Sequence, residues 1–283
     1  MSGKSAFFKK KKPSDWARFI AVWGAGMLTV SVLVYFIGFI LVKGVPNLSA
    51  GLFVFDDPKQ LSLLPPLIDT LILVGFTLLI TAPFGVFTAI YLVEYASRGS
   101  RLVRIIRVTT ETLAGIPSIV FGLFGYIFFV GWLGWGKSVL AGGFTLAVMI
   151  LPLIIRTTEE SLKSIPDSFR EGAFALGAGR LRTVLRVILP SAVQGIFAGV
   201  ILSVGRIVGE TAALIYTIGS VFDHPVSLAS PARTLALHVF TLAAEGFHRE
   251  QAYATAVVLL IIVIGINFLS SFAERRFTKS LNR

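Results

Sequence analysis

The chain has 283 residues, of which 55% are hydrophobic and only 14% are charged, and its mean hydropathy is +0.82. Charged residues make up about a quarter of ordinary soluble domains, so this composition excludes a soluble globular protein and indicates a membrane protein. The sequence has no cysteine, which excludes disulfides and cysteine-based zinc or redox sites.

Six uncharged stretches are each near or above the roughly 18 residues that a membrane-spanning helix needs. Backbone polar groups in hydrocarbon must be satisfied within the segment, and the alternation typical of barrel strands is absent. The sequence therefore predicts an all-α membrane protein with six transmembrane helices, at residues 19–42, 71–93, 112–136, 138–155, 187–205 and 251–273.

Four lysines at residues 9–12 precede the first span, as in a signal peptide. The apolar stretch exceeds the roughly 7–15 residues of such peptides, and no small-x-small cleavage site follows at residues 42–46, so we expect an uncleaved anchor. Because the lysines adjoin a span, membrane lipid rather than nucleic acid is their expected partner.

Lysine and arginine fall unequally on the two sides of these spans. With the N-terminus in the cytoplasm, 20 of the 26 lie inside, five lie outside, and Arg206 lies within the fifth span. The positive-inside rule therefore predicts that both termini are cytoplasmic, and the net charge of +11 becomes a topology signal. The expected parts are a cytoplasmic N-terminus (1–18), a first span (19–42), a five-helix core (67–274) with a cytoplasmic loop (156–190), and a cytoplasmic C-terminus (275–283).

Two outside segments, residues 43–66 and 223–250, are longer than a minimal turn. The first is rich in turn formers, so it is expected to lie flat on the membrane or to form a short helical cap. The second contains an apolar run at residues 235–244 that is too short to cross, which predicts an interfacial or partly re-entrant helix. The spacing of its histidines, His224, His238 and His248, matches no short metal motif, so no metal site is expected.

Two other connecting segments have misleading patterns. Residues 131–138 fit the nucleotide-binding pattern Gly-x4-Gly-Lys-Ser, but they join two spans on the outside and lack the strand that a P-loop needs. No ATP site is therefore expected in this chain. Arg101, Arg104 and Arg107 recur every three residues between aliphatic residues, which is typical of an interfacial helix.

The longest inside segment, residues 156–190, lies between the fourth and fifth spans. A short helix is expected to start near Pro166, with Asp167 or Ser168 as its cap and Glu171 in the first turn, where the helix dipole favours a carboxylate. Residues 177–179, Gly-Ala-Gly, interrupt it and permit a sharp turn or a backbone contact with another surface.

Within this loop Glu171-Gly172-Ala173, Gly177 and residues 187–190 (Val-Ile-Leu-Pro) keep the full spacing of the pattern Glu-Ala-Ala, three residues, Gly, nine residues, Ile-x-Leu-Pro. The segment resembles the coupling loop of type I ABC importer permeases, with Gly replacing the first Ala and Val replacing Ile. In that family the loop docks in a cleft of an ATPase subunit. The resemblance implies the type I permease fold and assigns ATPase coupling to Glu171, Gly172, Ala173 and Gly177.

Arg206 and Glu210 lie four residues apart in the fifth span, so on a continuous helix they share a face and are expected to pair. Gly205 and Gly209 beside them form a small-xxx-small pair that lets another helix approach closely. A central arginine should face a cavity or a partner charge. Two interpretations stay open: a pair that orients the bundle, or an anion path in which Glu210 keeps binding to Arg206 weak enough for release.

Arg156 and Glu159, three residues apart at the inside end of the fourth span, form a second pair that either gates exit or anchors the helix at the headgroups. Four stretches, residues 113–122, 151–160, 165–171 and 205–213, resemble the PstA family of phosphate-specific transport permeases, and the likeness extends over nearly the whole chain. It implies that Arg206, Arg156 and Glu159 are functional charges. The short outside loop after the first span favours PstA over the related PstC permeases.

This resemblance implies a non-catalytic permease subunit that translocates inorganic phosphate across the bacterial inner membrane. The implied partners are a homologous PstC-like permease, a PstB-like ATPase dimer that binds ATP and Mg²⁺, and a PstS-like phosphate-binding protein, with no cofactor on this chain. The alternatives are a permease for sulfate, molybdate or phosphonate, or a membrane signalling scaffold. An intramembrane enzyme is not expected, because the sequence has no His-Glu-x-x-His, no Gly-x-Ser-x-Gly and no paired membrane aspartates.

Overall fold

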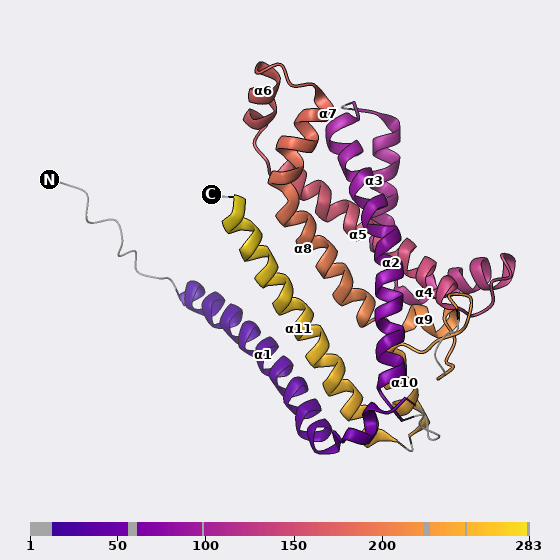
Figure 1. Ribbon diagram of the computed structural model, residues 1–283. Coiled ribbons are helices and arrows are strands. Elements are labelled where there is room, and N and C mark those ends of the chain that lie inside the picture. Colours follow the sequence, from indigo (N-terminus) through magenta and orange to yellow (C-terminus); the bar gives the residue numbers. More distant parts are fainter. Residues whose placement is uncertain (1–12, 56–60, 98, 223–226, 247, 282–283) are drawn as a thin grey trace.

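A computed structural model describes residues 13–55, 61–97, 99–222, 227–246 and 248–281 (Figure 1). All regular elements in these ranges are helical. The long helices are α1 (Pro13–Gly44), α2 (Leu64–Ile90), α5 (Val139–Lys163), α8 (Leu189–Val208) and α11 (Arg249–Leu281). The shorter ones are α3 (Arg101–Ala114), α4 (Ser118–Gly125), α6 (Asp167–Ala175), α7 (Arg180–Thr183), α9 (Ala212–Thr217) and α10 (Leu235–Glu245). Two 3-10 turns, η1 (Val45–Asn47) and η2 (Ala50–Phe53), and three π-helical turns, η3 (Tyr91–Tyr95), η4 (Tyr126–Trp132) and η5 (Val184–Ile188), connect or extend them.

Among the described residues, five helical segments are long and apolar enough to span a membrane, and a bent pair brings the number to six. The five are Arg18–Asn47, Leu64–Tyr95, Val139–Lys163, Arg180–Val208 and Arg249–Phe268. The structure confirms the all-α membrane class.

The predicted third span, residues 112–136, is wrong as one continuous helix. The chain bends by 105° between Arg101–Ala114 and Ser118–Trp132. Pro117 precedes α4 with ψ 142°, and a proline disfavours the helical conformation of the residue before it. Residues 112–114 therefore belong to α3, and the predicted third span is a bent pair of helices.

Helix α5 lies at the centre of the bundle, with about two-thirds of its most apolar window buried. It packs against α2 on one side and α8 on another, while α4 and α9 cover its outer end. Leu146, Ile150 and Ile154 on α5 form one core with Leu73 on α2 and Leu214 on α9. This arrangement fixes the C-terminal end of α5, which bears four charged residues, beside α3 and α8.

Close helix approach occurs at a glycine pair other than the predicted one. A Cβ atom at Gly195 or Gly199 on α8 would overlap the side chains of Ser161 and Thr157 on α5. At Gly205 the space within 4 Å is open, and Gly209 meets only a carbonyl of its own helix, so no helix of the described chain packs on that pair. The small-xxx-small contact that forms within the chain joins α5 to α8 and lies about three turns earlier on α8.

Helix α1 stands apart from the core. None of its most apolar window is buried, and its contacts are with α11, where the rings of Phe39 and Tyr253 lie 5.8 Å apart (Figure 1). Gly44, the last residue of α1, packs directly on the backbone of Tyr253, where a Cβ atom would clash. The C-terminal end of α1 is therefore in tight contact with α11.

Buried polar contacts hold the end of the bundle that carries α10. Asp69 on α2 accepts the Arg233 backbone N–H at 3.1 Å, and the Thr70 hydroxyl accepts that of Leu235 at 2.8 Å. These bonds seat α10 on α2 and α11, so the apolar run at residues 235–244 is a packed helix. Burial lowers the pKa of Arg233, although its guanidinium still donates to the Ser220 carbonyl. The described residues contain no metal-type cluster, and His224 lies outside them.

Candidate coupling surface and charged cavities

The four residues assigned to ATPase coupling lie on one projecting surface. Helix α6 has no buried residue, Glu171, Gly172 and Gly177 are exposed, and Ala173 is half-buried. The same surface exposes large apolar side chains: Phe169, Phe174 and Leu176. An acidic residue framed by exposed apolar side chains is typical of a protein interface rather than of a solvated loop.

Gly177 ends α6 in a left-handed conformation, with φ +81°. Its N–H donates to the Phe174 carbonyl at 2.9 Å, and the Ala178 N–H donates to the Ala173 carbonyl at 3.0 Å, which closes the helix end. Gly179 has φ −71°, which any residue adopts, so the sharp turn depends on Gly177 alone.

The start of α6 differs from the prediction. Pro166, not Asp167 or Ser168, occupies the cap position, and no side chain caps the helix. The Asp167 carboxylate accepts a hydrogen bond from Arg170 at 3.2 Å instead. Pro166 fits because its extended ψ of 142° and missing N–H suit the residue before a first turn.

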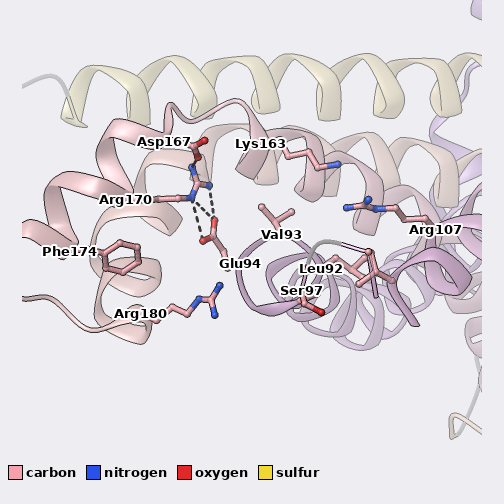
Figure 2. Close-up of a pocket in the computed structure, with 13 residues that line it drawn as sticks. Leu92, Val93, Glu94, Ser97, Arg107, Lys163, Asp167, Arg170, Phe174 and Arg180 are labelled. Atoms are coloured by element: carbon pink, nitrogen blue, oxygen red, sulfur yellow. Dashed lines mark hydrogen bonds and ion pairs between the residues drawn. The ribbon is translucent and has the colours of Figure 1, made fainter. Parts of the chain in front are cut away.

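A buried ion pair anchors α6 to the transmembrane bundle. Arg170 donates to the Glu94 carboxylate from Nη2 at 2.6 Å and from Nε at 3.1 Å, and to the carbonyl oxygens of Leu162 and Ile165 (Figure 2). The side chains of Glu94 and Arg170 are only 7% and 16% exposed. The hydrogen bond to Glu94 raises the pKa of Arg170 above its usual value, with partial burial opposing it. The pair links the π turn that ends α2 to the coupling helix.

The sequence analysis missed this pair because its members are 76 residues apart. One feature of the sequence could have indicated it: Glu94 is an acidic residue directly after an uncharged span. A carboxylate buried at that position needs a cation or water as a partner.

The second predicted pair, Arg156 with Glu159, is wrong in its partners. Arg156 Nε lies 3.0 Å from Glu160 Oε1, and both side chains are about two-thirds exposed. Glu159 faces inward, where its Oε1 atom lies 2.7 Å from Arg107 Nη2 and 2.6 Å from Lys163 Nζ. Glu159 therefore joins α3 to α5 through Arg107. Within α5, two i, i+4 ion pairs form in place of the predicted i, i+3 pair.

The first predicted pair does not form either. Helix α8 ends at Val208 with Gly209 as its cap, so Glu210 lies beyond the helix and does not share a face with Arg206. The Glu210 carboxylate accepts the Ala213 N–H at 3.2 Å in the first turn of α9, and no ion pair to Arg206 occurs among the described residues.

Arg206 and Arg156 instead line the same cavity, of about 190 Å³, between α5 and α8. Thr157 and Glu160 also line it, together with apolar residues of α3 and α5. The structure thus places on one cavity the two arginines that the sequence analysis assigned to a substrate path, although neither pairs with the carboxylate predicted for it.

The sequence profile of binding-protein-dependent transport system inner membrane components matches residues 81–283. The chain belongs to this family. A probable ABC transporter permease, YqgI of Bacillus subtilis (strain 168), is 32% identical over 90% of this chain and 92% of its own length. The phosphate transport system permease protein PstA of Pasteurella multocida (strain Pm70) is 33% identical over 86% of this chain and 91% of its own length.

Solved ABC transporters share the fold of this family member. A chain of a bacterial alginate transporter, solved with its alginate-pentasaccharide-bound periplasmic protein, aligns with a TM-score of 0.71 at 16% identity, over 94% of this chain and 96% of that one. A chain of the MetNI methionine transporter in an inward-facing conformation aligns with a TM-score of 0.61 at 22% identity, over 85% and 97%. The chain is therefore a multi-pass inner-membrane permease component with the fold of type I ABC importer permeases.

Proposed function

We propose that this permease passes inorganic phosphate through the membrane, driven by ATP hydrolysis on a separate ATPase subunit. The observation that carries the proposal is the cavity lined by both Arg156, in the C-terminal half of α5, and Arg206, in the last turn of α8. Two guanidinium groups offer planar, permanently charged donors that suit a tetrahedral oxyanion. Glu160 lines the same cavity and limits the net positive charge, which favours release over retention.

The likeness to several PstA proteins supports phosphate over other oxyanions. It also supports the partners: a homologous permease beside this chain, an ATPase dimer that binds ATP and Mg²⁺, and an extracytoplasmic phosphate-binding protein. The projecting surface of α6 then docks on the ATPase, with both termini in the cytoplasm, as the lysine and arginine distribution favours.

Reconstitution tests this proposal. The chain is copurified with its partner subunits, identified by mass spectrometry, and the complex is placed in liposomes with its binding protein. We expect ATP-dependent uptake of radiolabelled phosphate that excess sulfate, molybdate or phosphonate does not inhibit. Uptake of one of those ions instead of phosphate would show that the permease has a different substrate. Uptake that does not depend on ATP would refute the proposal that it belongs to an ATP-driven importer.

A further inference from the structure

A second, larger cavity lies beside the coupling helix. It has a volume of about 660 Å³, within the range of roughly 300–1,000 Å³ found for small-molecule sites. Its walls come from η3, α3, α5, α6 and α7, and Figure 2 shows Arg107 and Lys163 on one side with Arg170 and Arg180 on the other. Arg156 and Arg206 line the smaller cavity and not this one. A third cavity of about 260 Å³ lies between the two and shares Arg107 and Lys163 with the larger and Arg156 with the smaller.

The four cations of this cavity are only partly neutralised. Arg170 is balanced by Glu94, and Asp167 also binds it, but Arg107 and Lys163 share one carboxylate, that of Glu159. Buried Nε of Arg107 has no hydrogen-bond partner within the described chain. One positive charge and one buried donor are therefore left over on this side of the cavity.

Arg180 is the fourth cation, so the four face three carboxylates, those of Glu94, Asp167 and Glu159, and one positive charge is in surplus over the whole cavity. The Arg180 guanidinium lies over the Tyr95 ring, 5.5 Å from the ring centre, and no described carboxylate pairs with it. A guanidinium stacked on a ring keeps its edge donors available for an anion. Cations that approach one polar cavity from three helices and lack enough carboxylates point to an anionic ligand between them.

The position of the cavity indicates where the anion comes from. It adjoins the ends of two spans, the π turn after α2 and Lys163 at the end of α5, which is the headgroup level of the membrane. Basic pockets between helices at this level bind phosphate-bearing lipid headgroups, and a free phosphate ion presents the same group.

We propose that this cavity binds a phosphate-bearing anion through Arg180, Lys163 and Arg107. Because α6 and α7 form one wall and α3 and α5 form the other, the bound anion braces the coupling helix against the spans. Its ligands differ from Arg156 and Arg206 of the proposed path, and the site stands whether or not phosphate is the transported ion.

The test uses the purified full-length chain in phospholipid-free detergent and in nanodiscs of phosphatidylcholine alone or with phosphatidylglycerol. Binding of inorganic phosphate in detergent is measured by calorimetry, and hydrogen exchange of α6 is measured in all three preparations. We expect either phosphate or phosphatidylglycerol to slow exchange in α6, and Arg180→Gln to weaken that response by about tenfold or more, as loss of a charge-assisted contact should. Arg182→Gln is the matched control, since Arg182 is on the same short helix, is exposed, and does not line the cavity.

The outcomes separate the sources and the sites. Protection of α6 by phosphatidylglycerol alone assigns the site to a lipid headgroup, and protection by phosphate alone assigns it to the free ion. Phosphate binding that Arg206→Gln removes and Arg180→Gln leaves intact belongs to the translocation path, and would overturn this proposal while supporting the proposed function. Wild-type α6 exchange that neither phosphate nor phosphatidylglycerol changes would also overturn the proposal. Equal α11 exchange in Arg180→Gln and the wild type shows that the variant is folded.

Discussion

Replacing Glu94 by Gln should release the coupling helix from the transmembrane bundle. The substitution keeps the shape of the side chain but removes the charge that Arg170 binds through two donors at 2.6 and 3.1 Å. Arg170 would then remain largely buried with only exposed Asp167 as an acidic partner. The expected result is a coupling helix that separates from the end of α2 far more often.

The structure sets the size of this effect. Removing one partner of a buried pair costs about 3–5 kcal/mol, because an uncompensated charge stays behind. Arg170 is 16% exposed and keeps two carbonyl partners, so the lower end applies. At 1.4 kcal/mol per factor of ten, about 3 kcal/mol raises the undocked population of α6 on the order of 100-fold.

Hydrogen exchange of α6 in the purified chain measures this population. We expect about 100-fold faster exchange in α6 and wild-type exchange in α11. Glu160→Gln is the control, since its pair with Arg156 is about two-thirds exposed and worth about 0–1 kcal/mol. Because the pKa of Arg170 is raised in the folded chain, the stability that its charge contributes is fully present below its unfolded-state pKa and is lost only at strongly alkaline pH. The difference in α6 exchange between Glu94→Gln and the wild type should therefore not vary across neutral pH. Wild-type exchange of α6 in Glu94→Gln would refute the reasoning.

Three further predictions concern the loop, the path and the outside face. Gly177→Ala should lower the stability of the loop by about 1–2 kcal/mol, because Gly177 has φ +81°. A bulkier residue at Gly177 should uncouple ATP hydrolysis from uptake, whereas Gly179→Ala, at φ −71°, should transport normally. Unchanged coupling in the bulky Gly177 variant would contradict the docking role. Arg206→Gln should nearly abolish phosphate uptake at normal complex levels and Arg206→Lys should reduce it partially, so normal uptake by Arg206→Gln would place the anion path elsewhere. Single cysteines at Phe53 and Leu228, exposed on the two outside segments, should crosslink to the binding protein, and crosslinks only from α6 would show that the orientation is inverted.

Helix number and class follow from the sequence because hydrocarbon thickness and backbone satisfaction leave few solutions for long uncharged stretches. The bend before α4 was missed although Gly115 and Pro117 mark it, because hydropathy alone does not distinguish a straight span from one that turns at the interface.

The candidate site was harder to predict for two different reasons. Spacing rules presume a continuous helix, and Gly209 ends α8 just before Glu210, so the pair with Arg206 does not form. Long-range pairs such as Glu94 with Arg170 leave no trace in spacing, since only folding brings them together. The coupling motif could be predicted because its residues are close together in the sequence. Gly177 is needed for the left-handed conformation of its own turn, which does not depend on distant residues.

The crossing of α5 and α8 has a mechanical consequence. Gly195 and Gly199 leave no free space against Ser161 and Thr157, so neither helix can slide or rotate on the other without a steric clash. Arg156 precedes Thr157 on one helix, and Arg206 lies two turns beyond Gly199 on the other. We therefore expect α5 and α8 to move together whenever the coupling loop moves, with the spacing between the backbones that carry Arg156 and Arg206 unchanged.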